Sequence, residues 1–300
     1  MSSARHAVSV MSERISFTLD GNQVEAAPDE TIWQVAAREG VDIPHLCYAP
    51  EPGYRADGNC RACMVHVEGE RVLAASCLRQ PTEGMVVDTQ AERATKAREM
   101  VLELLAADQP DRATAHDGDS KFWQWADRTG VTESRFPGRD TPAPDMSHTA
   151  MAVNLDACIH CNLCVRACRE VQSNDVIGMA MRGADSKIVF DFDDPMGEST
   201  CVACGECVQA CPTGALLPAT MVDEAGVGVG AADKTVDSIC PFCGVGCQVT
   251  YHLKDDKIIK PQLAIQRLHA LTKSHKDVYI STEVGQHQMW AGQYYHYDVH

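Results

Sequence analysis

Two runs of closely spaced cysteines constrain this chain more than any other feature of its sequence. CIHCNLCVRAC begins at residue 158 and CVACGECVQACP at residue 201, and each run has the spacing C-x2-C-x2-C-x3-C. In such a run three thiolates surround one [4Fe–4S] cubane, while the fourth lies one helical turn further along and binds the neighbouring cubane. The sequence therefore predicts a domain with two [4Fe–4S] clusters over residues 151–222.

The spacing also predicts which cysteines share a cluster. Because the fourth thiolate of each run crosses over, we expect each cluster to take ligands from both runs. Cluster A would take Cys158, Cys161, Cys164 and Cys211, and cluster B would take Cys201, Cys204, Cys207 and Cys168. Pro212 follows the second run as expected, whereas Arg169 replaces proline after the first, a change that we expect to affect loop stiffness more than ligation.

Zinc and isolated buried thiols are the alternatives for these cysteines. Zinc sites typically use two C-x2-4-C pairs brought together across a longer loop, and a tight four-cysteine run fits that arrangement poorly. Cysteines that only fill a core would be scattered along the chain. Iron–sulfur clusters are therefore the favoured interpretation of the block from residue 158 to residue 211.

The segment 12–90 predicts a small β-grasp-like domain. Residues 15–19 and 23–27 flank an Asp-Gly-Asn turn, which is typical of a hairpin. Thr31 can cap a short helix that ends at Gly40. Alternating apolar and polar residues then predict further strands.

A [2Fe–2S] cluster is expected in this domain. Its predicted ligands are Cys47, Cys60, Cys63 and Cys77. Gly53 and Gly58 would let backbone amides approach and donate hydrogen bonds to the sulfurs, which stabilises the more negative reduced cluster. A zinc knuckle held by the same four thiols is the alternative, although it would not need the glycine-rich loop.

Composition limits the location and the partners. Fifteen cysteines would suggest disulfides in a secreted protein, but the N-terminal residues MSSARHAVSVMSERISF lack the pattern of a signal peptide, so we expect a cytoplasmic location. No stretch approaches the about 18–20 apolar residues that cross a bilayer, so we expect no direct membrane insertion. A formal charge of −16 argues against a nucleic-acid partner, because phosphate binding needs a surplus of Lys and Arg.

Three features together resemble a known family. They are the run HLCYAPEPGYRADGNCRACMVHVEG, the double four-cysteine block and the later run CPFCGVGC. About residues 12–256 resemble the N-terminal half of the alpha subunit of NAD-dependent, molybdenum- or tungsten-containing formate dehydrogenases. Related architecture occurs in the large clustered subunit of respiratory complex I and in diaphorase subunits of NAD-reducing hydrogenases.

The resemblance implies a missing cluster in the middle of the chain. Many of those relatives carry a [4Fe–4S] cluster there, bound by one histidine and three cysteines, but the equivalent stretch of this chain has no cysteine. We expect no cluster, and we expect His116 to be a surface or hydrogen-bonded histidine. Residues 91–135 are interpreted as a helical spacer and residues 136–150 as a Pro-rich linker. The apolar stripe of the spacer helix, predicted to pack as core, is Met100, Val101, Leu104 and Leu105.

Residues 234–256 resemble the start of the [4Fe–4S] lobe of a bis-molybdopterin-guanine-dinucleotide oxidoreductase. Its candidate ligands are Cys240, Cys243 and Cys247. The fourth cysteine of that family is missing, so this third [4Fe–4S] site is expected to be incomplete, and assembly of a cluster is left open. In the full-length family a metal–pterin domain holds molybdenum or tungsten. The resemblance implies that this domain is absent here, so we expect no formate oxidation by this chain alone.

Residues 257–300 differ in character from the rest. They resemble the start of the thiamine-diphosphate-binding domain of acetolactate synthase large subunits, in which the matching Glu283, Gly285, Gln286 and His287 would face the diphosphate. The Gly-Asp-Gly metal loop of that family is missing, so no working thiamine site is expected. A gene fusion and a chimeric reading are the two explanations, of which we favour the chimera.

The predicted fold class is α+β, and the predicted function is electron transfer. In the formate dehydrogenase family, electrons from formate would pass through the clusters to a flavin/NAD-binding diaphorase subunit. We expect that subunit as the partner. The alternatives are a diaphorase or complex I-type subunit, and a non-catalytic zinc-binding or chimeric fragment.

Overall fold

The structure is a computed structural model that describes residues 14–140, 142–223, 227–228, 232–239, 245–246 and 248–253. The chain divides into one unit over Met1–Val229 and a second over Gly230–His300. The predictions for Cys240, Cys243 and Cys247 and for the tail 257–300 lie outside the described residues.

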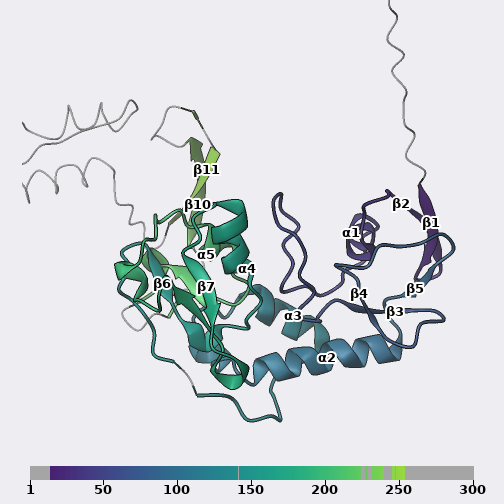
Figure 1. Cartoon of the computed structure of the whole chain (residues 1–300), viewed down its shortest axis with the longest axis horizontal. Helices are drawn as coiled ribbons and strands as arrows, with labels where there is room; N and C mark the ends of the chain where they lie inside the picture. Colours follow the sequence, from purple (N-terminus) through teal and green to yellow (C-terminus); the bar gives the residue numbers. More distant parts are fainter. Residues whose placement is uncertain are drawn as a thin grey trace, which may run out of the picture. The chain divides into compact units, whose positions relative to one another are not determined.

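The N-terminal domain is built on a mixed five-stranded sheet (Figure 1). Its strands, in the spatial order β2-β1-β5-β3-β4, are β1 (Ile15–Leu19), β2 (Asn22–Ala26), β3 (Met64–Val67), β4 (Ala74–Ala75) and β5 (Val86–Asp88). β1 pairs antiparallel with β2 and parallel with β5, while β3 pairs antiparallel with β4 and β5. Phe17, Val65 and Val87 lie fully buried, or nearly so, in the core of this sheet domain.

Local sequence signals form the start of this domain. The β1–β2 hairpin turns at Asp20 and Gly21, which both have positive φ (49° and 83°), as two-residue hairpin turns require. Helix α1 (Ile32–Arg38) begins after Thr31, whose hydroxyl accepts the Gln34 N–H at 3.3 Å, while the Gln34 side chain accepts the Thr31 N–H at 2.9 Å. This reciprocal cap confirms the predicted role of Thr31.

The spacer contains two helices, α2 (Glu92–Ala106) and α3 (Lys121–Thr129), and a 3-10 turn at Arg112–Thr114. Here the predicted apolar stripe of α2 is partly wrong, because Met100 and Leu104 are 37% and 48% exposed. The buried residues of α2 are Ala94, Arg98 and Leu102.

Packing against neighbouring elements determines which face of α2 is buried. Leu102 packs against Leu46 of the N-terminal domain and Phe122 of α3. The same face carries Arg98, whose guanidinium donates to the Met64 carbonyl of β3 at 3.3 Å. A prediction from apolar periodicity does not choose a helix face that contains an arginine as the buried face. Here Arg98 is nevertheless buried, because its guanidinium has a backbone partner.

The third part of the first unit consists of short elements. β6 (Met151–Val153) pairs antiparallel with β9 (Leu216–Pro218), and β7 (Ile177–Ala180) with β8 (Lys187–Phe190). Helix α4 (Leu163–Arg166) continues into a π-helical turn (Ala167–Val171). Helix α5 (Glu206–Ala210) occupies the equivalent position in the second cysteine run. Further 3-10 turns lie at Leu155–Ala157, Gly183–Asp185, Met196–Glu198 and Ala219–Met221. Cys164, Cys168 and Cys207 are members of its apolar core.

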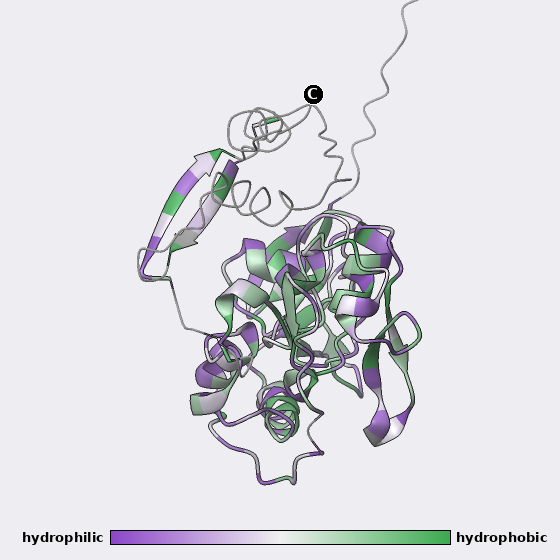
Figure 2. Ribbon diagram, turned by 90° about the vertical axis from the view of Figure 1, so that its left-hand side faces the viewer, coloured by the Kyte–Doolittle hydropathy of each residue, from purple (hydrophilic) through white to green (hydrophobic). Residues whose placement is uncertain are grey.

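The described part of the second unit is a ribbon of β10 (Lys234–Ile239) and β11 (Gln248–Leu253), paired antiparallel. Hydrophilic and hydrophobic residues are interleaved along both strands (Figure 2). Among the helices of the described residues, none combines the length and the apolar character that crossing a membrane requires.

Candidate iron–sulfur centres

The four cysteines predicted to bind [2Fe–2S] come together in the N-terminal domain. Cys47 lies in the loop after α1, Cys60 and Cys63 precede β3, and Cys77 follows β4. The sulfurs of Cys63 and Cys77 are 3.4 Å apart. The Cys60 N–H donates to the Cys47 sulfur at 3.4 Å. All of these thiols are buried except that of Cys60, which is half-buried.

The glycine-rich loop acts on these sulfurs indirectly. The amides that donate to Cys47 belong to Asn59 and Cys60, and not to the glycines themselves. Gly58 has a φ of 63°, and an added Cβ would lie 2.2 Å from the Leu78 side chain. Gly58 therefore permits the turn that points the next two amides at the sulfur.

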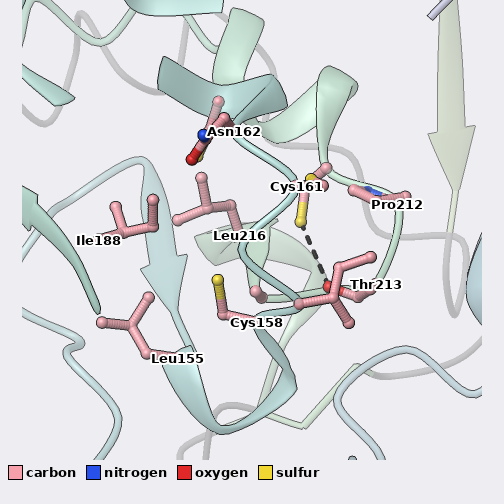
Figure 3. Close-up of a pocket in the computed structure, with 12 residues that line it drawn as sticks. Leu155, Cys158, Cys161, Asn162, Ile188, Pro212, Thr213 and Leu216 are labelled. Atoms are coloured by element: carbon pink, nitrogen blue, oxygen red, sulfur yellow. Dashed lines mark hydrogen bonds between the residues drawn. The ribbon is translucent and has the colours of Figure 1, made fainter. Parts of the chain in front are cut away.

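The structure gathers the cysteines expected for cluster A around one cavity (Figure 3). Its empty volume is about 370 Å³. Its four cysteines are Cys158, Cys161, Cys164 and Cys211, and its apolar lining includes Leu155, Ile159, Ile188 and Leu216. The Thr213 hydroxyl lies 3.7 Å from the Cys211 sulfur.

The cysteines expected for cluster B line a second cavity. Its empty volume is about 300 Å³, and its four cysteines are Cys168, Cys201, Cys204 and Cys207. Met151, Val176 and Ile177 contribute apolar surface. The fourth cysteine of each run therefore lines the cavity that the other run surrounds, as the crossed spacing predicts.

The two loops reach this arrangement through equivalent backbone kinks. In each loop the residue before the second cysteine and the residue after it have positive φ. The pairs are His160 (52°) with Asn162 (60°), and Ala203 (57°) with Gly205 (78°). Successive amides in such a loop point inward and form a concave site for negative charge. The His160 N–H donates to the Cys158 sulfur at 3.5 Å, and the Ala203 N–H donates to the Cys201 sulfur at 3.4 Å.

Comparison with protein families assigns three regions. Residues 12–92 match the 2Fe-2S iron-sulfur cluster binding domain, and residues 157–215 match the 4Fe-4S dicluster domain. Residues 233–269 match the molybdopterin oxidoreductase Fe4S4 domain. These matches confirm the predicted cluster types, and the last extends beyond residue 257, where we expected the foreign tail to begin.

Comparison with individual proteins gives the same assignment. One chain in the crystal structure of an NAD+-reducing [NiFe]-hydrogenase in the H2-reduced state is 30% identical, with a TM-score of 0.62 and coverage of 68% of this chain and 87% of that chain. The NADP-reducing hydrogenase subunit HndD of Solidesulfovibrio fructosivorans is 33% identical over 233 residues, which are 74% of this chain and 39% of that protein. This chain belongs to the same family of iron–sulfur electron-transfer subunits.

Two further relatives show how widely the family extends. The mitochondrial NADH-ubiquinone oxidoreductase 78 kDa subunit of Candida albicans is 32% identical over 222 residues, covering 71% of this chain and 30% of that protein. A putative formate dehydrogenase of Staphylococcus haemolyticus, SH0748, is 24% identical over 290 residues, covering 84% of this chain and 29% of that protein. The chain thus spans between about three tenths and two fifths of these curated relatives. The comparisons do not confirm the resemblance to acetolactate synthase, and they do not single out formate dehydrogenase within the family.

The pKa values of the cysteine thiols differ between the [2Fe–2S] site and the dicluster region. Hydrogen bonds from the Cys60 and Cys77 thiols lower the pKa of Cys47 to about 2. The Cys77 thiol likewise lowers the pKa of Cys63 to about 7, whereas the pKa values of Cys60 and Cys77 are raised, first by their hydrogen bonds to Cys47. The four thiols of the [2Fe–2S] site are therefore coupled through their mutual hydrogen bonds, and all four would bind iron as thiolates.

Burial dominates in the dicluster region. It raises the pKa of Cys158 to about 11 and that of Cys207 to about 12, and it raises those of Cys161 and Cys164 as well. Without metal these four thiols are neutral at pH 7. Because a cluster binds thiolates, loading must release protons from the sites.

We call the loop Cys158–Cys164 loop A and the equivalent loop Cys201–Cys207 loop B. Two residues that the sequence did not assign to the site support loop A. Arg139, inside the predicted linker, donates to the carbonyls of Leu155 and Cys158 at 2.9 Å each. His116 is buried, with Nε2 at 2.8 Å from a carboxylate oxygen of Asp156. His116 is thus hydrogen-bonded, and the alternative of a surface histidine was wrong. No sequence motif marks Arg139, because its acceptors are backbone carbonyls distant along the chain.

Proposed function

We propose that this chain passes electrons between the metal–pterin site of a formate dehydrogenase and a flavin/NAD-binding subunit. The supporting observation is the order of its domains, in which a molybdopterin oxidoreductase Fe4S4 domain follows the 2Fe-2S and dicluster domains. The alignment with the putative formate dehydrogenase SH0748 covers 84% of this chain, against 74% for HndD. The proposed location is the cytoplasm.

The proposed ligands are the cysteines that the structure gathers at each site. Cys47, Cys60, Cys63 and Cys77 would hold [2Fe–2S], and the crossed sets around the two cavities would hold [4Fe–4S] clusters A and B. These clusters supply one-electron transfer. Around them, the apolar linings exclude water and the loop amides donate hydrogen bonds to sulfur, which stabilises the negative charge that arrives with an electron.

Short helices hold the two dicluster sites together. Cys164 lines one cavity and Cys168 the other, and one helical turn from α4 into the π-turn separates them. Cys207 and Cys211 are related in the same way through α5. This double connection keeps both sites at a constant short separation, which suits stepwise electron transfer.

A hydrogenase or complex I-type subunit is the second candidate function. The identities to HndD (33%) and to the 78 kDa subunit (32%) favour it, since both exceed the 24% identity to SH0748. The run from Cys240 to Cys247 argues against a hydrogenase diaphorase subunit, but its three cysteines lie outside the described residues.

Anaerobic purification of the full chain tests the relay. We expect about ten irons per chain for one [2Fe–2S] and two [4Fe–4S] clusters, and about four more if the third [4Fe–4S] site assembles. Rapid reduction by NADH in the presence of the flavin subunit, and by formate in the intact complex, would support the formate dehydrogenase assignment. Reduction by hydrogen or by NADH without any response to formate would favour the second candidate. A colourless protein that contains zinc would overturn both.

The origin of residues 257–300 is a separate proposal. We propose a chimeric join near the C-terminal end of the chain. The Fe4S4 domain match up to residue 269 supports a junction further along the chain than residue 257. Genomic DNA sequenced across and beyond codons 240–270 tests it, and an uninterrupted oxidoreductase reading frame would exclude the chimera.

A further inference from the structure

A buried arginine lies where the [2Fe–2S] loop meets loop A. Arg166 is the last residue of α4, between Cys164 and Cys168, and is 2% exposed. Burial of a guanidinium is costly unless its donors are satisfied. The partners of Arg166 therefore show what this position does.

Those partners come from both sites. One terminal nitrogen, Nη2, donates to the Cys47 carbonyl at 2.7 Å and to the Cys161 carbonyl at 3.1 Å. The other, Nη1, donates to the Arg55 carbonyl. Nε lies 3.3 Å from a carboxylate oxygen of Asp57. A single side chain thus holds the backbone of a [2Fe–2S] ligand and that of a cluster A ligand.

The two ligands also share apolar packing. Cys47 and Cys161 belong to one buried cluster with Ala49 and Leu163. At its edge, the Asn59 side chain lies 3.5 Å from the Cys161 carbonyl. The contact between the two sites is therefore dry at its centre, and charge acts more strongly there than in water.

The charge of Arg166 is distinct from that of its neighbour. The Arg55 side chain pairs with Glu170 at 2.9 Å and also with Asp57, but it is 62% exposed, so solvent screens its charge. Arg166 is shielded from solvent, and Asp57, its carboxylate partner, offsets part of its charge. A buried cation stabilises the reduced form of a nearby cluster, because reduction adds one negative charge.

We propose that Arg166 is a positioning residue that joins the [2Fe–2S] site to cluster A and raises the reduction potentials of both, so that one electron passes directly between them. The inference rests on the proposed relay function. In each transfer one cluster loses the electron that the other gains, and no atom or proton moves. The middle segment of this chain, which has no cysteine, is not needed for this step.

Redox titration of the full, anaerobically loaded chain, followed by EPR, tests this role. In Arg166→Gln we expect the ratio of reduced to oxidised [2Fe–2S] at a given potential to fall about tenfold, which corresponds to about 59 mV for a one-electron couple. Cluster A should shift in the same direction. Cluster B serves as the internal reference and should shift much less. Arg166→Lys keeps the charge, so its ratio of reduced to oxidised [2Fe–2S] should lie close to the wild-type ratio.

Two further variants keep the test decisive if Arg166→Gln loads poorly. Asp57→Asn leaves Arg166 in place but removes its counter-charge, so we expect a shift of opposite sign. Arg128→Gln is the matched control, because it removes an exposed positive charge that pairs with another carboxylate, Asp42, and should leave both ratios nearly unchanged. Weaker magnetic coupling between the [2Fe–2S] and cluster A signals in Arg166→Gln would further support the positioning role.

The outcomes separate this inference from the proposed function. Fully loaded Arg166→Gln with wild-type ratios overturns the inference, and so does Asp57→Asn with an unchanged or lowered ratio. Equal shifts of all three clusters would also overturn it, because they would indicate a general loss of structure. A wild-type chain without iron–sulfur EPR signals would instead overturn the relay itself.

Discussion

Loop A and loop B share one cysteine spacing and one set of backbone kinks, yet they differ in what covers them. Cys161 of loop A is 8% exposed and packs with Cys47 of the N-terminal domain, whereas the equivalent Cys204 of loop B is exposed. Val202, two residues before Cys204, is 63% exposed. The same motif therefore leaves its second cysteine buried in loop A and exposed in loop B.

This difference teaches that the motif determines ligation but not potential. Desolvation disfavours the added negative charge of a reduced cluster, so burial alone would lower the potential of cluster A relative to cluster B. Arg166 acts against that trend from inside the same contact. Four predictions test the comparison, in order of decreasing effect.

Cysteine removal should separate the two loops most strongly. Cys161→Ala removes a ligand with no solvent access to replace it, so we expect loss of the whole of cluster A, from about ten irons per chain to about six. At the exposed position, Cys204→Ala should retain part of cluster B, because water can reach the open iron site. Iron analysis with EPR measures both, and equal losses would contradict the comparison.

Exposure to air should distinguish the intact sites. Oxidation of cluster ligands follows their accessibility, and Cys204 is exposed whereas Cys161 and Cys164 are buried. We expect the EPR signal of cluster B to decay several-fold faster than that of cluster A. Faster decay of cluster A would show that the N-terminal domain does not shield it.

The metal-free chain should lose stability in alkaline solution. Burial raises the pKa of Cys158 to about 11 and of Cys207 to about 12, above the ordinary value of 9.0. Below pH 9 the folded and unfolded states both hold these protons. Above it the unfolded state releases them first, so each thiol lowers the free energy of unfolding by about 1.4 kcal/mol per pH unit up to its folded pKa.

Urea titrations of the metal-free chain from pH 8 to pH 11 measure this loss. The cluster-loaded chain is the control, since its cysteines are already thiolates and its stability should change less over the same range. A metal-free chain of constant stability would show that its thiols are solvated and that the cavities have opened.

The smallest effect concerns a hydrogen bond between the N-terminal domain and the helix of loop B. The Tyr54 hydroxyl donates to a carboxylate oxygen of Glu206, the first residue of α5, at 2.8 Å. Tyr54→Phe keeps the ring and should lower the free energy of unfolding by about 1–2 kcal/mol. Glu206→Gln, which retains an acceptor, should cost less. Denaturant unfolding measures both. A free energy of unfolding that is unchanged in Tyr54→Phe would show that this contact does not stabilise the fold.

Local features were predictable because local chemistry determines them. The hairpin turn at Asp20 and Gly21, the cap at Thr31 and the number and type of the clusters follow from residue spacing and backbone preferences. The crossed grouping of the eight dicluster cysteines was also predictable, because one helical turn separates the last cysteine of each run from the others.

The sequence by itself therefore determined which cysteines gather and which clusters their spacing suits. Only the tertiary structure decided which face of α2 is buried, that Arg139 supports loop A and that Arg166 spans two sites. In each of these cases a side chain bonds to backbone carbonyls or packs against residues far away in the chain. Such partners leave no local pattern, because a carbonyl is present at every position and the fold alone selects which one a guanidinium meets.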